Sequence, residues 1–204
     1  MQRFSNSVMK NMNRHVLRDG PRVLTADRPC DVFINHRGID TKKTFSGLLF
    51  QYLSHLDIKC FLDRKSMKPG DHLFDNINRA IHGCKVGVAV LSPRYCLSTY
   101  CLHELALMLE TKKKVIPIFY DVVPSQLHIM CRGSSMAYSS RDLERYSWAL
   151  EEVRNIVGLI FDPSRHDWSE LLSNASSAVI KSLMDVEEEG WPRGISNVIS
   201  EKPN

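Results

Sequence analysis

The sequence predicts an α/β protein in which a parallel sheet of about five strands is covered by helices on both faces. Short apolar runs alternate along the chain with segments whose apolar residues recur at helical spacing, and this alternation is typical of such a sheet. The run Val86–Leu91 is apolar at nearly every position, as expected for a strand that is buried on both sides. With 204 residues, 43% hydrophobic and 25% charged, the chain has room for one globular domain and some tail.

The expected strands follow one another at 31–35, 58–62, 86–91, 115–119 and 159–161. The fourth contains Pro117, which argues against an ordinary central strand because proline cannot donate a backbone hydrogen bond. Thr41 can cap the first helix, whose apolar positions run from Phe45 to Leu53. The turn Lys68–Asp71 precedes a second helix that ends at Gly83. Three further helices are indicated at 101–110, 142–156 and 168–184.

Residues 1–29 differ in composition from the rest of the chain. They hold six basic and two acidic residues, which leaves 21 of each sign in the remainder. We expect a disordered basic extension here; an organelle transit peptide is the alternative, since apolar residues recur every four positions among few acids. Residues 30–185 are expected to form the folded domain. Residues 186–204, with the acidic run Glu187–Glu189, are expected to be a flexible tail.

Composition argues against three classes of protein. A body without net charge is atypical of nucleic-acid-binding proteins, which normally carry a basic face. The six cysteines form no CxxC pair and match no usual zinc spacing, so they are interpreted as reduced thiols, and no metal site is expected. No apolar run approaches the roughly 20 residues that are needed to cross a bilayer.

Ligands of such a sheet bind beyond the carboxyl ends of the strands, where the strand order reverses. The segments to watch are therefore 35–40, 64–71, 92–100 and 121–127. In the first of them, Gly38 allows close backbone approach and Arg37 can hold a pyrophosphate through paired donors. An ordinary surface turn with an exposed arginine is the alternative. Taken alone, Glu104 is most simply a solvated helix glutamate near a helix amino terminus.

Four stretches at matching spacings resemble a plant Toll/interleukin-1 receptor (TIR) domain, and most closely the stand-alone plant proteins of that domain only. Asp31–Thr41 resembles the first strand and its loop, and Lys68–Asp71 resembles the mobile loop after the second strand. Tyr100–Leu105 resembles the helix with the catalytic glutamate. Ile116–Ser125 resembles the fourth strand and its exit loop.

The resemblance implies a flavodoxin-like sheet and an NAD+ glycohydrolase that breaks the nicotinamide–ribose bond, giving nicotinamide with ADP-ribose or a cyclic ADP-ribose variant. It implies Glu104 as the catalytic residue and Gly70 as a residue of loop gating. NAD+ would be the substrate and no cofactor or metal would be needed; NADP+ is an alternative substrate. Contacts with the substrate are implied for Asn35, His36, Arg37, Gly38, Asp40 and Tyr100.

The resemblance also implies activation by self-association through TIR–TIR contacts, a role in plant defence and cell-death signalling, and other TIR proteins as further partners. The implied location is cytoplasmic or nucleo-cytoplasmic, with targeting to an organelle through residues 1–29 as the alternative. Two of the implied contacts stay open between two interpretations. His36 could contact the substrate or pack, and Tyr100 could stack on nicotinamide or adenine or be a partly buried aromatic at the start of its helix.

One carboxylate could suffice for this chemistry. Ordinary glycosidases use two carboxyl groups, one of which protonates a poor leaving group. Nicotinamide on ribose is a cationic leaving group and departs neutral, so no acid is required. Glu104 could stabilise the oxocarbenium-like ribose as an anion. If it also takes a proton from a ribose hydroxyl, that oxygen can attack the anomeric carbon within the molecule and close a ring.

The sequence departs from the usual family pattern at several positions. Asn35-His36 replaces Ser-Phe, Ile39 replaces an acid, Tyr100 replaces a tryptophan, and Ser46-Gly47 replaces a Ser-His pair that helps relatives associate. These changes support an alternative, a non-catalytic module that modulates the assembly of other TIR proteins. A nucleic-acid-dependent nuclease or cyclic-nucleotide synthase has little support from the neutral body. A phosphoacceptor receiver domain is set aside, because it needs an acidic pair where this chain has Asn35-His36-Arg37.

Overall fold

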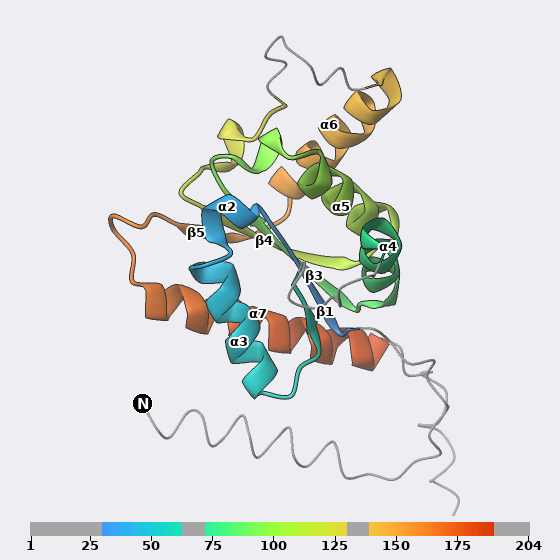
Figure 1. Ribbon diagram of the computed structural model, residues 1–204. Helices are drawn as coiled ribbons and strands as arrows, with labels where there is room; N and C mark the ends of the chain where they lie inside the picture. Colours follow the sequence, from blue (N-terminus) through green and yellow to red (C-terminus); the bar gives the residue numbers. More distant parts are fainter. Residues whose placement is uncertain (1–29, 63–71, 130–138, 190–204) are drawn as a thin grey trace, which may run out of the picture.

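The computed structural model describes residues 30–62, 72–129 and 139–189 (Figure 1). Its strands form one parallel sheet in the order β2-β1-β3-β4-β5. This is the flavodoxin-like order, and it confirms the predicted fold class. The strands are β1 (Val32–His36), β2 (Cys60–Phe61), β3 (Val86–Leu91), β4 (Lys114–Tyr120) and β5 (Leu159–Phe161).

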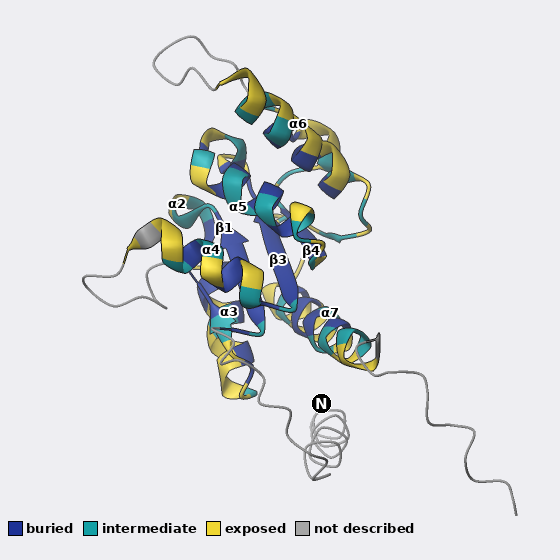
Figure 2. Ribbon diagram, turned by 90° about the vertical axis from the view of Figure 1, so that its right-hand side faces the viewer, coloured by how far each residue is buried: buried dark blue, intermediate teal, exposed yellow. Residues whose placement is uncertain are grey.

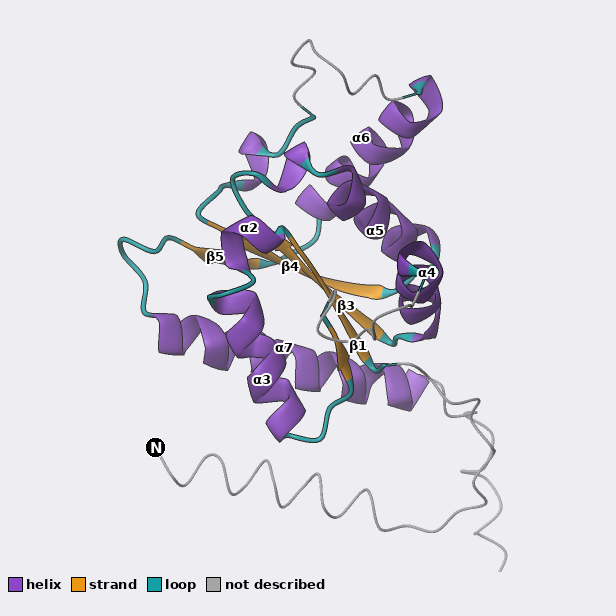
Figure 3. Cartoon of the chain, in the orientation of Figure 1, coloured by secondary structure: helices purple, strands orange, loops and turns teal. Residues whose placement is uncertain are grey.

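Helices alternate with the strands along the chain, as Figure 3 shows. Each expected helix is present, with its bounds displaced by a few residues or, for the last, extended. Two 3-10 turns, η2 (Tyr95–Leu97) and η3 (Pro124–Gln126), follow β3 and β4. The α-helices are α2 (Gly38–Thr41), α3 (Phe45–His55), α4 (Leu73–Gly83), α5 (Thr99–Glu110), α6 (Ser140–Arg154) and α7 (Trp168–Glu189).

The sheet separates two hydrophobic cores. Phe33 of β1 belongs to the core under α4, α5 and α6, whereas its neighbours Val32 and Ile34 belong to the core under α3 and α7. Successive side chains of a strand point to opposite faces, so one strand supplies both cores. Figure 2 shows the strands as the buried layer between the two groups of helices. All six residues of β3 are buried, as the apolar run 86–91 predicts.

Glycine lets the helix that carries Glu104 pack closely on the sheet. A Cβ atom on Gly87 of β3 would lie 2.4 Å from the sulfur of Met108, far inside van der Waals contact. Met108 lies on α5 and is fully buried. The Met108 side chain therefore fills the space that Gly87 leaves, and a larger residue at position 87 would push α5 away from β3.

The prediction that Pro117 disfavours a central strand is wrong. β4 lies between β3 and β5, and Pro117 is paired in register with Ala89. β5 begins to pair with β4 only at Ile118, so Pro117 lies just before that ladder. Gly158 makes the approach possible, since a Cβ atom there would lie 2.4 Å from the Pro117 carbonyl oxygen.

Two expected boundaries also need correction. Thr41 does not cap α3: it is the last residue of the short helix α2, and Thr44 is the N-cap. The Thr41 hydroxyl instead accepts a hydrogen bond of 2.8 Å from Ser46. At the other end, α7 continues to Glu189, so residues 186–189 are helical although the sequence assigns them to a flexible tail. Lys85 anchors this last turn through an ion pair of 2.7 Å with Glu187.

Other sequence-based expectations concern residues beyond these ranges. Gly70 and the turn Lys68–Asp71, the extension 1–29 and residues 190–204 lie outside the described residues. Ser46 and Gly47, which lie in the first turn of α3, are both buried. Within the described ranges, no helix has the length and apolar character that crossing a membrane requires.

Candidate active site

A cleft opens at the carboxyl edge of the sheet, where β1 and β3 lie side by side. The chain turns from β1 to one neighbour and from β3 to the other, so this is the point at which the strand order reverses. The cavity has a volume of about 350 Å³. Its walls come from the end of β1, from α2, from α4 and from the start of α5. The lining residues are Phe33, Ile34, His36, Arg37, Gly38, Ile39, Lys42, Ile77, Ser98, Tyr100, Cys101 and Glu104.

Glu104 faces this cleft from the second turn of α5. The helix begins at Thr99, and the hydroxyl of Ser98 caps it by accepting a hydrogen bond from the Cys101 backbone N–H at 3.3 Å. Leu102 and Leu105 beside Glu104 are fully buried, which fixes the rotation of the helix. Glu104 is left partly buried on the side that borders the cavity. An anion is favoured near a helix amino terminus.

Asn35 contacts the carboxylate directly. Its Nδ2 donates to Oε2 of Glu104 at 2.7 Å and lies 3.2 Å from the carbonyl oxygen of Cys101. The sequence predicts Asn35 as a substrate contact. Asn35 is fully buried and does not line the cavity. The structure therefore supports a different role, in which the Asn35 amide orients the Glu104 carboxylate through this hydrogen bond.

Tyr95 lies behind Asn35 and was not singled out from the sequence. It is fully buried in η2, and its hydroxyl donates to Asn35 Oδ1 and lies 3.1 Å from the Cys101 carbonyl oxygen. Burial raises the pKa of Tyr95 well above its usual value, so the phenol keeps the proton that it donates. Its position in segment 92–100, which follows β3, was the only signal in the sequence.

Cys101 borders the cleft but is not a reactive thiol. Burial raises the pKa of Cys101 to about 12, which keeps the sulfur protonated near neutral pH. The thiol donates to the carbonyl oxygen of His36 at 3.3 Å. Cys101 therefore links α5 to the end of β1, next to the predicted site residues.

The residues that follow β1 form the second wall. His36 is 7% exposed, and its Nδ1 lies 3.3 Å from the Ile34 carbonyl oxygen; it both packs and borders the cavity. Arg37 is the N-cap of α2. Its Nε is buried and has no hydrogen-bond partner among the described residues. Gly38 lines the cavity with open space around it, since a Cβ atom would meet only the Lys42 side chain, at 3.8 Å.

Asp40 is not placed to contact a ligand in the cleft. Its carboxylate accepts hydrogen bonds from the Ser92 hydroxyl at 2.6 Å and from the backbone N–H of Arg94 at 3.0 Å. It also pairs with the Arg94 guanidinium at 2.6 Å. The side chain is 5% exposed and is absent from the cavity wall. Asp40 thus ties α2 to the loop after β3, which corrects its assignment as a substrate contact.

Tyr100 stands at the rim of the cleft with 48% of its surface exposed. Its ring stacks on Phe74 of α4, with 5.3 Å between the ring centroids. Phe74 is 51% exposed and was not predicted from the sequence. Two exposed rings side by side leave an aromatic surface next to the cavity, on which a planar base could stack.

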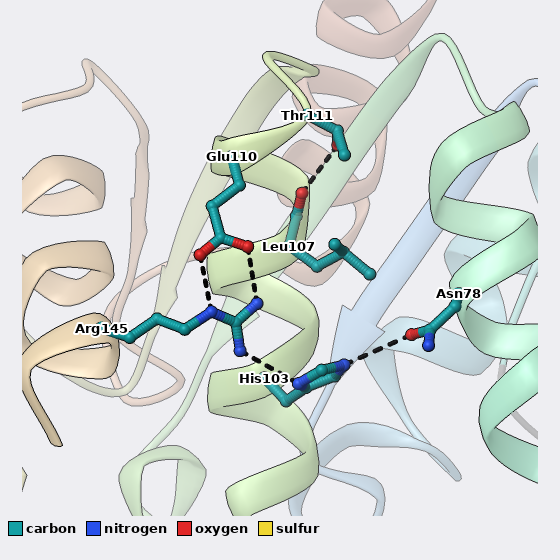
Figure 4. Close-up of polar contacts among 6 residues, drawn as sticks. All are labelled: Asn78, His103, Leu107, Glu110, Thr111 and Arg145. Atoms are coloured by element: carbon teal, nitrogen blue, oxygen red, sulfur yellow. Dashed lines mark hydrogen bonds and ion pairs between the residues drawn. The ribbon is translucent and has the colours of Figure 1, made fainter. Parts of the chain in front are cut away.

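A polar cluster fixes the other side of α5 (Figure 4). Arg145 of α6 makes a two-pronged ion pair with Glu110, with N···O distances of 2.6 and 2.7 Å. The same guanidinium lies 3.0 Å from Nδ1 of His103. Because arginine can only donate, Nδ1 of His103 must be the acceptor nitrogen and Nε2 must carry the proton. Nε2 lies 3.3 Å from the side-chain oxygen Oδ1 of Asn78 on α4. The cluster therefore joins α4, α5 and α6 one residue away from Glu104.

The cluster predicts a loss of stability at acid pH. Burial and the charge of Arg145 lower the pKa of His103 below 6.5, so below about pH 6.5 the unfolded chain binds a proton that the folded chain resists. The free energy of unfolding should therefore fall as the pH is lowered through this range. As the pH is lowered below about 6.5, the melting temperature of the wild type should fall more than that of His103→Gln. His55→Gln, at an exposed histidine of α3, is the control; parallel curves for wild type and His103→Gln would contradict the prediction.

Among residues 30–62, 72–129 and 139–189, no group of three or more His, Cys, Asp or Glu side chains is arranged to hold a metal ion. The five cysteines in these ranges are free thiols.

Comparisons with known proteins agree on one family. Residues 30–193 match the TIR domain family. The chain is 46% identical over 158 residues to the probable 2' cyclic ADP-D-ribose synthase BdTIR of Brachypodium distachyon, an alignment that covers 77% of this chain and 70% of that protein. It is 33% identical to the TMV resistance protein N of Nicotiana glutinosa over 63% of this chain but only 12% of that protein. The chain thus matches a small part of the much longer resistance protein.

A solved structure agrees as well. The TIR domains in the activated Roq1 resistosome, which directly recognises the pathogen effector XopQ, are 32% identical to the chain, with a TM-score of 0.65. The match covers 74% of this chain and 99% of that one.

Proposed function

The chain belongs to the TIR domain family, and from this premise we propose that it is an enzyme that cleaves NAD+ at the nicotinamide–ribose bond. The observation that carries the proposal is the placement of Glu104. Its carboxylate borders a cavity of about 350 Å³ at the switch point of the sheet, which Arg37 also lines. The relative BdTIR is named a probable 2' cyclic ADP-D-ribose synthase, which supports NAD+ as the substrate class.

Glu104 is proposed as the catalytic residue. As the nicotinamide–ribose bond breaks, the positive charge of the nicotinamide ring is lost and the ribose becomes cationic. A carboxylate already oriented at that position stabilises the developing charge without reorganisation. No second carboxyl group is needed, because nicotinamide leaves as a neutral molecule. Cys101, whose thiol also borders the cleft, stays protonated and is not proposed as a nucleophile.

Arg37 and Gly38 are proposed to bind the pyrophosphate of NAD+. The buried Nε of Arg37 has no hydrogen-bond partner among the described residues, and a buried donor of this kind gains from an anionic acceptor. Gly38 has open space beside its backbone, so phosphate oxygens can come close. Lys42 borders the same wall and adds positive charge. Tyr100, with Phe74, is proposed as the surface for a planar ring of the substrate.

The product is proposed to include a cyclic ADP-ribose variant. The relative BdTIR, a probable 2' cyclic ADP-D-ribose synthase, supports ring closure as well as hydrolysis. In the same cleft, Glu104 can accept a proton from a ribose hydroxyl, which then attacks the anomeric carbon. Water attacking the same carbon gives linear ADP-ribose.

The enzyme is proposed to act in immune signalling and to be activated by contacts between TIR domains. Similarity to the TMV resistance protein N supports the role in immunity. Similarity to the TIR domains of the activated Roq1 resistosome supports activation by association. A cytoplasmic location is proposed, supported by the five free thiols in the described ranges, which are typical of a reducing compartment.

The proposal is tested by tethering the purified protein to beads at increasing surface density and incubating it with NAD+. The rate of nicotinamide release per molecule should rise with density, and NADP+ in parallel reveals the substrate preference. Release that is independent of density would contradict activation by self-association but not the activity. No release at any density, with the protein shown to be folded, would favour the non-catalytic interaction module.

A further inference from the structure

We propose that Tyr95 and Asn35 form a hydrogen-bonded relay that holds the Glu104 carboxylate in one orientation, which makes both of them positioning residues for the reaction. The relay connects η2, the end of β1 and the second turn of α5. It rests on the proposed function, because its purpose is to orient the catalytic carboxylate. None of its three residues lies next to another in the sequence.

The Asn35 amide can adopt only one orientation here. Its Nδ2 faces two acceptors, Oε2 of Glu104 at 2.7 Å and the Cys101 carbonyl oxygen at 3.2 Å. Its Oδ1 accepts from the Tyr95 hydroxyl. Rotating the amide by half a turn would point Oδ1 at these two oxygens, and neither the Glu104 carboxylate nor the Cys101 carbonyl can donate to it. Each contact therefore reinforces the same orientation.

Tyr95 anchors the relay in the core. Both Tyr95 and Asn35 are fully buried, so water does not compete for these hydrogen bonds. The Tyr95 ring belongs to the core under α4, α5 and α6, and the phenol stays protonated because it is buried. Its hydroxyl lies within reach of both Asn35 and the Cys101 carbonyl oxygen. The donor at the far end of the relay is thus fixed by packing.

The consequence for Glu104 is a carboxylate with one oxygen fixed toward the protein. Oε2 is tied to Asn35, so the carboxylate cannot rotate without losing a charge-assisted hydrogen bond. A preoriented anion costs less reorganisation when the ribose becomes cationic.

Kinetics of two variants test the relay. Asn35→Leu keeps the size of the side chain and removes its hydrogen bonds, and Tyr95→Phe removes one hydroxyl. We expect kcat for nicotinamide release to fall roughly 10- to 100-fold in Asn35→Leu and about 10-fold in Tyr95→Phe. KM should stay within about twofold, since neither residue lines the cleft that would hold the substrate. Asn174→Leu, on the exposed face of α7, is the matched control and should keep full activity.

A third variant separates positioning from structural support. Asn35→Asp is nearly isosteric and keeps an acceptor for Tyr95, but it puts a second carboxylate against Glu104. The ratio of its kcat to that of the wild type should rise as the pH is lowered. The reason is that a proton shared by the two adjacent carboxyl groups restores a hydrogen-bond donor to Glu104. A deficit that does not depend on pH would overturn the relay.

A readout that needs no turnover completes the test. In the NMR spectrum of the side-chain amides, one Asn35 proton should resonate downfield in the wild type and shift upfield in Glu104→Ala. An Asn35 signal that does not respond to Glu104→Ala would overturn the proposed contact. Unaltered kcat in folded Asn35→Leu, with an active wild type, would overturn the positioning role alone. A folded wild type that releases no nicotinamide would overturn the proposed function and the relay's role together.

Discussion

Replacing Glu104 with glutamine is expected to lower kcat for nicotinamide release roughly 100- to 1,000-fold. The amide keeps the size of the side chain but removes the negative charge that faces the reacting ribose. Stabilisation of charge that develops only in the transition state appears in kcat, whereas KM should change little. Steady-state kinetics with bead-tethered protein at a fixed surface density give both constants.

Two features of the chain make this substitution informative. Asn35 would still donate to the oxygen of the new amide, so the cleft keeps its shape and the loss reports on charge. Glu151→Gln makes the same chemical change on the exposed face of α6 and should retain full activity. Equal activities of Glu104→Gln and Glu151→Gln would show that Glu104 is not the catalytic carboxylate.

Replacing Arg37 with alanine is expected to raise KM for NAD+ roughly 10- to 100-fold, with a smaller effect on kcat. The Nε of Arg37 is buried at the cavity wall and has no hydrogen-bond partner among the described residues, so its contribution is made when an anion binds. The Arg37–pyrophosphate contact would stabilise the bound substrate and the transition state equally. Its loss should therefore raise KM and leave kcat nearly unchanged.

Arg37→Lys refines this prediction. Lysine keeps the charge but lacks the planar fork of donors that binds two phosphate oxygens at once, so only part of the affinity should return. Arg141→Ala, at an exposed arginine of α6, controls for the loss of one positive charge from the surface. A KM for Arg37→Ala that matches the wild type would place the pyrophosphate elsewhere in the cleft.

Most of the fold could be predicted because hydrophobic periodicity reports burial directly. The run 86–91 is apolar at nearly every position, and β3 is buried along its whole length. Pro117 misled the prediction because a single residue does not reveal where the neighbouring ladder begins; β5 pairs with β4 only after this proline. The prediction that Thr41 caps the first helix failed because the short helix α2 takes up Thr41, and Thr44 is the N-cap of α3.

The candidate site was predicted in part. Glu104, His36, Arg37, Gly38 and Tyr100 all line the cleft, because residues that follow β1 and β3 meet at the same edge of a parallel sheet. The resemblance to TIR domains also implied Asn35 and Asp40 as substrate contacts, yet both are turned toward protein partners. At a strand end or in a short helical turn, tertiary packing decides toward which side a side chain points. The local sequence pattern carries no information about that packing.

Tyr95 and Phe74 could not be identified from the sequence, and the reasons differ. Tyr95 acts through Asn35, 60 positions away along the chain, so the contact exists only after β1 and η2 have come together. Phe74 belongs to the contact between α4 and α5, where it stacks on Tyr100. Its exposed position on an amphipathic helix gives it no distinguishing pattern before folding.

The most direct test of Glu104 as the residue that cleaves NAD+ is to incubate bead-tethered wild type and Glu104→Ala side by side with NAD+ and to identify all products by mass spectrometry. We expect nicotinamide together with ADP-ribose or a cyclic ADP-ribose variant from the wild type, and neither from Glu104→Ala. Intact NAD+ with the folded wild type, or equal release from both proteins, would contradict this role of Glu104.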